Sequence, residues 1–256
     1  MTETRTVVTG ATGHLGRPTM AALRAAGQDV VGLTSSGGPG LVQVNLLEED
    51  SAANGLLAAL AGADTVVHAA TTNGRLDLRM AENLVAAASA ARIRHLVLIS
   101  IVGIERIPIG FYRDRVRIEE IALGSGVPLT ILRATQFHSF VDGVFSAQRF
   151  SPVILTPSVR LQPIAVEDVA ARLAEFAMEE PAGRAHDIGG PAVRTGRDLQ
   201  SAWRAATGSH RPALPLRFPG RLGAAYAAGA ALVPGVPFGV STFEDYLARR
   251  YAWRPR

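Results

Sequence analysis

Short apolar runs rich in β-branched residues alternate with longer alanine-rich or amphipathic segments through the first half of the chain. The runs that predict strands are 6–9, 29–33, 41–45, 65–68, 95–99 and 129–133, and the segments that predict helices are 18–26, 51–60, 76–91 and 111–123. Strands separated by helices of this length favour parallel pairing with right-handed crossovers. The pattern therefore predicts an α/β protein with a doubly wound parallel sheet.

The first predicted strand ends in a glycine-rich turn that opens a helix. Its glycines, Gly10, Gly13 and Gly16, have the spacing G-x-x-G-x-x-G. Gly10 permits a sharp turn, Gly13 allows the backbone to approach a pyrophosphate, and Gly16 allows the helix to pack closely on the strand. Because the N–H groups and the positive dipole end of a helix start attract phosphates, the turn predicts a Rossmann-type dinucleotide site.

The regular alternation ends near residue 141. We divide the chain there into a dinucleotide-binding core, 1–141, and a small C-terminal substrate-capping region, 142–256, which also supplies late elements of the core. This region is predicted to contain extended segments at 159–166, a helix at 167–178, a strand at 185–188 and a helix ending at Thr207. They are followed by a proline-rich linker or lid base at 210–220 and an uncharged alanine-rich helix at 223–232. That last helix is too short to span a bilayer, and we expect it to cover the substrate pocket or form a dimer contact.

The residues after the second predicted strand bear on the choice of dinucleotide. An acidic residue at this place would bind the ribose 2′-hydroxyl of NAD, but this chain has Thr34, Ser35 and Ser36. Hydroxyl groups can donate to a 2′-phosphate, and this segment has no carboxylate to repel one. It therefore favours NADP, with Arg17 as the candidate cation for the phosphate; ordinary loop polarity is the alternative explanation of the serines.

Composition excludes several kinds of chemistry. The chain of 256 residues has no cysteine, and its His, Asp and Glu residues show no metal-ligand spacing, so we expect neither thiolate catalysis nor a metal. All 26 basic residues are arginines, scattered among acidic residues at a net charge of +4, which gives no basic stripe for nucleic acid. With no apolar run of membrane-spanning length and no export signal, we expect a cytoplasmic protein without a membrane partner.

Several motifs together resemble those of the atypical short-chain dehydrogenase/reductases. They are TGATGHLG at 9–16, HAA at 68–70, IS at 99–100, LRATQF at 132–137 and IAVEDVA at 164–170. Within this superfamily the chain is most similar to NmrA-like NAD(P)-binding proteins, over residues 4–250.

The resemblance implies where NADP would bind. It implies cofactor contacts from Gly10, Thr12, Gly13, His14, Leu15, Gly16, Thr34, Ser35, Ala70 and Thr71. It also implies that Ser100 lines the nicotinamide pocket and that Thr135, Gln136 and Phe137 lie against the nicotinamide end. These positions follow strand ends, where doubly wound sheets bind their ligands.

The helix after the fifth strand departs from the pattern of this superfamily. Typical members carry Tyr-x-x-x-Lys there, with the tyrosine as acid/base and the lysine holding the ribose. This chain has Phe111 at the first position and Arg115 at the second. Tyr112 lies about 100° around the helix from Phe111 and is expected to point away from the site. Arg115 either binds a ribose hydroxyl or forms a surface pair with Glu119.

His138 is the remaining candidate for a proton donor, because it directly follows the predicted nicotinamide segment. The alternative is a packed or surface histidine. We therefore assign catalytic roles to Ser100, His138 and Arg115.

Without the tyrosine and lysine, a simple ketone would lack its proton donor. A delocalised acceptor needs less help, so the leading hypothesis is an NADPH-dependent reductase that transfers hydride to a flat, electron-poor small molecule: a quinone, an enone or a polycyclic aromatic. Two alternatives stay open. One is a non-catalytic NmrA-like protein that senses NAD(P) for a protein partner, and the other is an isomerase or cyclase. We expect a monomer or homodimer.

Overall fold

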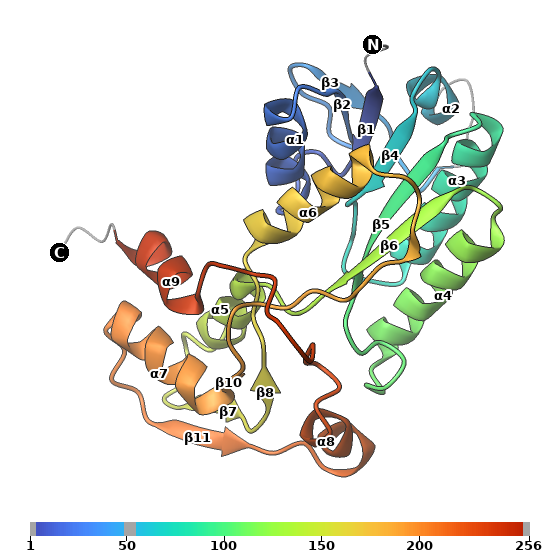
Figure 1. The fold of residues 1–256 in the computed structure, drawn as a ribbon. Coiled ribbons are helices and arrows are strands. Elements are labelled where there is room, and N and C mark those ends of the chain that lie inside the picture. Colours follow the sequence, from blue (N-terminus) through green and yellow to red (C-terminus); the bar gives the residue numbers. More distant parts are fainter. Residues whose placement is uncertain (1–3, 49–54, 253–256) are drawn as a thin grey trace. The chain divides into compact units, whose positions relative to one another are not determined.

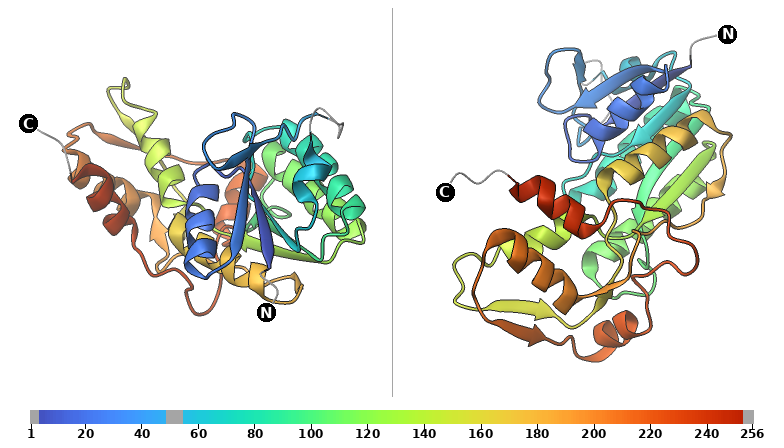
Figure 2. Two further views of the ribbon diagram at one scale, coloured as in Figure 1. Left: turned by 90° about the horizontal axis from the view of Figure 1, so that it is seen from above. Right: turned by 60° about the vertical axis from the view of Figure 1, so that its left-hand side comes forward.

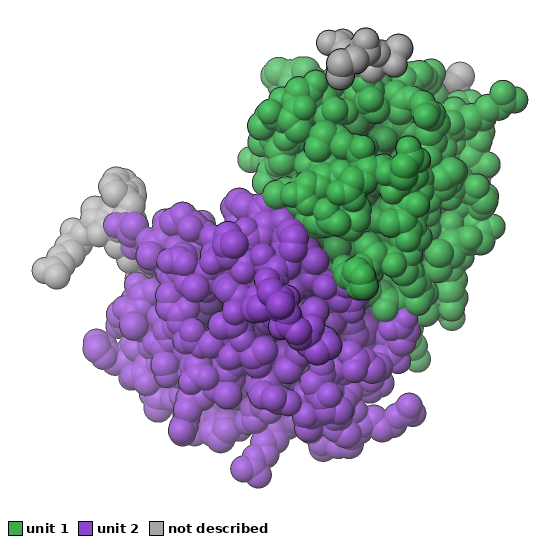
Figure 3. Space-filling model, viewed as in Figure 1, with its two compact units in different colours: residues 1–100, 110–133, 169–186 green, residues 101–109, 134–168, 187–256 purple. Residues whose placement is uncertain are grey.

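The computed structural model describes residues 4–48 and 55–252. These form two compact units, shown separately coloured in Figure 3. Unit 1 comprises the described residues of 1–100, 110–133 and 169–186, and unit 2 those of 101–109, 134–168 and 187–256. The units alternate along the chain, and the single boundary expected after residue 141 stays a prediction.

Unit 1 is built on a seven-stranded sheet with the order β3-β2-β1-β4-β5-β6-β9. Its strands are β1 (Arg5–Thr9), β2 (Asp29–Thr34), β3 (Leu41–Gln43), β4 (Thr65–His68), β5 (His95–Ile101), β6 (Leu129–Ala134) and β9 (Gly183–Arg184). Pairing is parallel from β3 through β5 and again between β6 and β9. The strand order reverses between β1 and β4, where such sheets bind their ligands. The predicted doubly wound Rossmann-type fold is confirmed.

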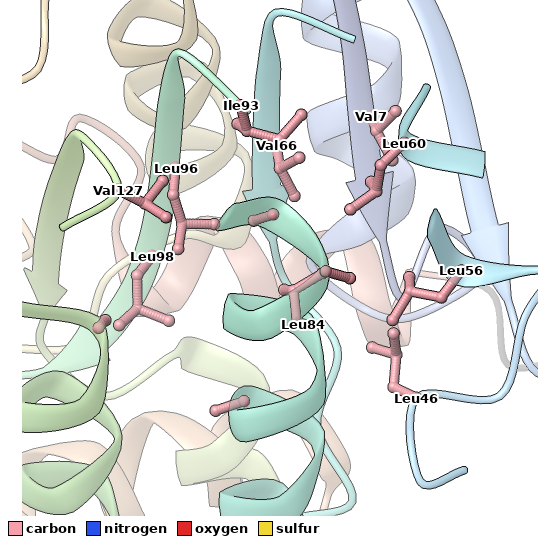
Figure 4. Packing of buried hydrophobic residues seen from close by; sticks show 14 of the residues in the cluster. Val7, Leu46, Leu56, Leu60, Val66, Leu84, Ile93, Leu96, Leu98 and Val127 are labelled. Atoms are coloured by element: carbon pink, nitrogen blue, oxygen red, sulfur yellow. The ribbon is translucent and has the colours of Figure 1, made fainter. Parts of the chain in front are cut away.

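Helices cover both faces of this sheet (Figures 1 and 2). On one face lie α1 (Gly16–Ala25) and α6 (Val166–Met178), and on the other lie α2 (Leu56–Leu60), α3 (Leu76–Ala90) and α4 (Gly110–Gly124). Figure 4 shows the packing on the second face, where Val66 and Leu96 of the sheet meet Leu84 of α3. All three side chains are buried, and burying each one stabilises the fold by about 1.5–3 kcal/mol.

Two predicted elements of unit 1 have different bounds in the structure. The helix predicted at 51–60 is found at Leu56–Leu60, and its predicted start at Ser51 lies outside the described residues. The strand predicted at 185–188 lies earlier, at Gly183–Arg184. There it pairs with Thr130 and Ile131 of β6. The predicted segment continues alongside β6, because the Ala185 N–H donates to the Ile131 carbonyl and Ile188 forms an isolated parallel bridge with Ala134.

Unit 2 combines helices with two small sheets. Its elements are α5 (His138–Ser146), β7 (Ile154–Pro157), β8 (Arg160–Leu161), β10 (Arg194–Thr195), α7 (Gly196–Thr207), β11 (Ala213–Leu216), α8 (Gly220–Ala227) and α9 (Phe243–Tyr251). β8 pairs antiparallel with β10, and β7 pairs parallel with β11. The linker prediction for 210–220 is therefore wrong at β11. All four residues of that strand are exposed, so it has no inward apolar face to reveal it in the sequence.

A buried carboxylate, Asp142 of α5, joins three helices of unit 2. It accepts hydrogen bonds from Trp203 Nε1 of α7 (2.9 Å) and from the hydroxyls of Tyr246 (3.2 Å) and Tyr251 (2.7 Å) of α9. Burial and the charge of Asp142 raise the pKa of Tyr246 to about 12, so this hydroxyl remains a donor at neutral pH. Since each helix packs its apolar residues around this group, the carboxylate fixes the register of α5, α7 and α9.

Among the described residues, no helix combines the length and apolar character needed to cross a membrane.

We expect Asp142→Asn to lower the free energy of unfolding by about 1–3 kcal/mol. The amide has one acceptor oxygen where the carboxylate has two, and it lacks the negative charge that strengthens the hydrogen bonds from Trp203, Tyr246 and Tyr251. Chemical denaturation followed by circular dichroism measures this change. Asp29→Asn, at an exposed position of β2, is the matched control. Equal stability of the two variants would contradict the role given to Asp142.

Candidate functional site

The glycine turn brings the ends of β1 and β4 and the start of α1 into backbone contact. Gly10 has φ +67°, and a Cβ there would lie 2.7 Å from Ala70 Cα. A Cβ at Gly16 would lie 2.1 Å from the Gly10 carbonyl oxygen, and one at Gly13 would lie 3.0 Å from the same atom. The Gly13 N–H donates to that oxygen at 2.8 Å. Only glycine therefore permits these approaches at positions 10 and 16.

The start of α1 offers backbone donors at the surface. Thr12, Gly13 and His14 are exposed, while Leu15 and Gly16 are buried. Leu15 is the N-cap residue, and no side-chain hydrogen bond caps the helix. A helix start without a side-chain cap retains N–H groups for an anion, and the dipole favours negative charge there. The turn therefore fits a pyrophosphate.

Hydroxyl groups at the end of β2 lie against this turn. Thr34 Oγ1 is 3.2 Å from Thr12 Oγ1 and 3.2 Å from Ser36 Oγ. Thr34 is buried, whereas Ser35 and Arg17 are exposed. The structure thus joins the two predicted segments through hydroxyls, and it leaves Ser35 open to a ligand at the end of the strand.

A buried ion pair occupies the carboxyl end of β4. Arg115 of α4 is 8% exposed; its guanidinium pairs with the Asp77 carboxylate of α3 and donates to Thr71 Oγ1 at 2.8 Å. Asp77 also accepts from the backbone N–H and the hydroxyl of Thr72, each at 2.6 Å. Burial alone would raise the pKa of Asp77, but the hydrogen bonds from Thr71 and Thr72 and the charge of Arg115 lower it below its ordinary value. We call these four residues the Arg115–Asp77 cluster.

The cluster changes the interpretation of Arg115. The predicted surface pair with Glu119 is wrong, because Glu119 is itself buried and accepts from Arg133 Nε and Nη2 at 2.8 and 2.6 Å. Asp77 was not singled out from the sequence. Its only local signal is its place in the first turn of α3, where the helix dipole favours an acidic residue.

Phe111 and Arg115 share one face of α4, as the motif comparison predicts. The Arg115 guanidinium carbon lies 4.9 Å from the centroid of the Phe111 ring. Tyr112 is buried, and its ring centroid lies 6.1 Å from that of Phe111. The face that carries the tyrosine and lysine in typical members therefore presents a phenyl ring and a guanidinium that is already paired.

Two further polar residues of unit 1 end neighbouring strands. His68 Nδ1 of β4 is 2.8 Å from Thr9 Oγ1, and burial together with the charge of Arg115 lowers the pKa of this histidine to about 4. It is therefore neutral and has a structural role. Ser100 of β5 is buried, and its Oγ has no hydrogen-bond partner among the described residues. An unpaired buried hydroxyl is costly, so Ser100 retains a donor and acceptor for a ligand.

The predicted nicotinamide segment belongs to unit 2. Thr135 Oγ1 donates to the Gln162 carbonyl, Phe137 is half-buried, and the buried Gln136 amide has no partner among the described residues. The structure thus brings the glycine turn, Thr34, Ala70, Thr71 and Arg115 together in unit 1. It places 135–138 in the other unit.

His138 is packed inside unit 2. Its Nε2 lies 3.0 Å from the Ser241 carbonyl oxygen, and its ring centroid is 5.8 Å from those of Phe243 and Tyr246. Burial lowers its pKa. These contacts give the histidine a structural role, and proton donation by it stays a prediction.

Comparison with known proteins agrees with this geometry. A family model described as NAD(P)H-binding matches residues 10–180, which include the glycine turn and the Arg115–Asp77 cluster. The chain is 28% identical over 222 residues to divinyl chlorophyllide a 8-vinyl-reductase, chloroplastic, of Oryza sativa subsp. indica, an alignment that covers 74% of this chain and 55% of that protein. The chain thus spans about half the length of this curated relative.

Solved structures show the same fold at low identity. An NADPH-dependent quinone oxidoreductase from Escherichia coli, complexed with NADPH, superposes with a TM-score of 0.78 at 17% identity, covering 96% of this chain and 99% of that one. The triphenylmethane reductase of Citrobacter sp., complexed with NADP(H), gives a TM-score of 0.73 at 17% identity with the same coverage. The predicted relationship to NAD(P)-binding Rossmann proteins is confirmed, and since the family model matches more than half of its length, the chain belongs to the NAD(P)H-binding family.

Proposed function

We propose that the protein is an NADPH-dependent reductase that transfers hydride to a flat, electron-poor small molecule such as a quinone, an enone or a polycyclic aromatic. The observation that carries this proposal is the face of α4 described above. Phe111 has no proton to give, and the Arg115 guanidinium is buried against Asp77 and Thr71. An arginine is also too weak an acid to serve as proton donor at neutral pH.

The absence of an acid on this face selects the acceptor. Hydride transfer to a simple ketone generates a localised alkoxide, which needs a proton as it forms. A quinone or extended enone spreads the negative charge over its conjugated system, and water can protonate it later. For such an acceptor the protein has to bind, orient and exclude water from the reacting atoms.

The residues of unit 1 fit the dinucleotide that would supply this hydride. The glycine turn, with Thr12, His14 and Leu15, would hold the pyrophosphate through backbone N–H groups. Thr34, Ser35 and Arg17 would bind the 2′-phosphate of NADP, while Ala70 and Thr71 would contact the dinucleotide where β4 ends. Ser100 would offer its unpaired hydroxyl. Thr135, Gln136 and Phe137 of unit 2 are the proposed contacts for the nicotinamide end.

Three of the similar proteins support the same class of reaction by what their names say. They describe reduction of a quinone, of a triphenylmethane dye and of a vinyl group on a chlorophyllide. Each name joins a reductase to a conjugated small molecule, which is the kind of acceptor that the Phe111 and Arg115 face favours.

A sensor of the NmrA-like type is the second candidate. The observation that favours it is the packing of His138 against Phe243 and Tyr246. Arg115 is paired with Asp77, so two of the three predicted catalytic residues are held by contacts within the protein, although His138 Nδ1 and Arg115 Nε, like Ser100 Oγ, have no partner among the described residues. A sensor would bind NADPH and reduce no acceptor.

We expect NADPH to bind more tightly than NADH, and Ser35→Glu to reverse that preference. Ser35 is exposed at the end of β2, so the new carboxylate would repel a 2′-phosphate and accept a hydrogen bond from a 2′-hydroxyl. NADPH binding should weaken at least about tenfold, or 1.4 kcal/mol. Calorimetric titration of both dinucleotides measures this, with Ser35→Gln as the uncharged control. An unchanged preference in Ser35→Glu would remove Ser35 from the phosphate site.

We expect NADPH oxidation with menadione to exceed that with cyclohexanone by about 10²–10⁴-fold, the contribution that general acid catalysis makes where it is present. The loss of NADPH absorbance at matched acceptor concentrations measures both rates. Tyr112→Phe should leave the menadione rate unchanged, because Tyr112 is buried and lies about 100° around α4 from Phe111. Comparable rates with both acceptors would contradict the proposal. Tight NADPH binding without turnover of any quinone or enone would favour the sensor.

A further inference from the structure

Unit 2 contains a cavity of about 860 Å³ that the proposed reductase site does not use. Its walls come from the 156–160 segment, α7, β11 and α8, all within this unit. Figures 1 and 2 show β11 beside β7, leading from α7 to α8. Its volume is within the usual range of small-molecule sites, about 300–1,000 Å³.

The cavity is lined on two sides by regularly spaced side chains. Arg197, Gln200 and Arg204 lie three and four residues apart on α7, which places them on one face of that helix. Ala213 and Pro215 alternate along β11, and Arg217 follows at the same spacing. The arrangement follows from the periods of a helix and a strand that face each other across the cavity.

Four arginines line the cavity: Arg160, Arg197, Arg204 and Arg217. None of the described lining residues is acidic. Arg204 Nε donates to the Ser209 carbonyl at 3.0 Å, which leaves the arginine charge uncompensated. Among the described residues, no acid lies within ion-pair distance of Arg197 or Arg217. Asp198, the neighbouring acid on α7, is held in the capping box with Thr195, and the charges of Arg194 and Arg197 act on it from nearby. The cavity therefore has an excess of positive charge.

A buried donor marks the same place. Gln200 is 3% exposed, lines the cavity, and has an Nε2 with no hydrogen-bond partner among the described residues. Buried donors in folded proteins are nearly always paired. The guanidinium groups and this amide nitrogen are all donors, so an acceptor would satisfy them, and a negatively charged acceptor would form the strongest hydrogen bonds with the guanidinium groups.

Part of the lining is apolar and comes from Pro157, Val159, Pro215 and Tyr226. The hydroxyl residues Thr156, Ser158, Thr195 and Ser201 also line the cavity. A free inorganic anion would leave these surfaces in water, whereas an organic anion would cover them. We propose that this cavity binds a small amphiphilic anion, a carboxylate or a phosphate monoester, whose apolar body lies against Tyr226 and Pro215. This site depends on unit 2 alone and does not rest on the proposed reductase function.

The test uses three probes with one apolar body: 2-naphthoate, 2-naphthyl phosphate and the neutral 2-naphthamide. Each is titrated calorimetrically into the full-length chain with saturating NADPH. At least one anion should bind at least about tenfold more tightly than the amide, because it accepts charge-assisted hydrogen bonds. The tighter of the two anions identifies the carboxylate or the phosphate as the preferred group.

Single variants locate the binding. Arg197→Gln and Arg217→Gln change exposed arginines and should each weaken the preferred anion about tenfold while leaving naphthamide unchanged. Arg221→Gln, an exposed arginine of α8 outside the lining, is the matched control and should have no effect. NADPH affinity should be the same in all three variants.

Three results would overturn the proposal: no binding of either anion at millimolar concentration, equal binding of the anions and naphthamide, or an equal loss in Arg221→Gln and Arg217→Gln.

Gln200→Met gives an independent check, because it removes the amide and keeps the volume of the side chain. It should weaken the anion, and unchanged affinity in a folded variant would count against the site. The two proposals can fail separately. If an anion binds as expected but the protein neither binds NADPH nor reduces any acceptor, the reductase proposal is rejected and the anion site stands.

Discussion

The buried ion pair between Arg115 and Asp77 is the constraint on which the proposed chemistry depends. Removing two charges from water is costly, and such a pair persists only where further hydrogen bonds satisfy both groups. Thr71 and Thr72 provide such bonds here, just after β4, and Arg115 Nε is left without a partner among the described residues. The pair therefore links α3, α4 and the strand end at which the sheet reverses its order. Because the guanidinium is used in this way, Arg115 stabilises the site but supplies no proton.

A second buried pair completes the attachment of α4. Glu119 lies one turn after Arg115 and accepts from Arg133 of β6, and Arg184 of β9 lies 3.5 Å from the same carboxylate. The helix is thus held toward α3 by Arg115 and toward the sheet edge by Glu119. Phe111, at the start of the same helix, is fixed relative to Arg115 by the contact of its ring with the guanidinium. A face made of a phenyl ring and a paired guanidinium, without an acid, suits an acceptor that needs orientation more than protonation.

The sequence predicted the parts of the fold that depend on local pattern. Apolar runs between helices identified β1 to β6, and the spacing of Gly10, Gly13 and Gly16 identified the turn. Contacts between distant residues left no such pattern: Asp77 and Arg115 are 38 residues apart, so only the i,i+4 pairing with Glu119 was visible. The hydrogen bonds to Asp142 could not be predicted for the same reason, because their donors come from the distant helices α7 and α9. β11 was missed because it pairs through its backbone and exposes every side chain.

Hydride transfer without a proton from the protein is tested most directly by the solvent isotope effect on kcat. The measurement compares quinone reduction by saturating NADPH in H₂O and D₂O across neutral pH. With no acid acting in the transition state, the ratio should be about one and kcat should not depend on pH. A ratio of about two or more, together with a decline of kcat as pH rises, would show a protein acid in the reaction and contradict the role given to the Phe111 and Arg115 face.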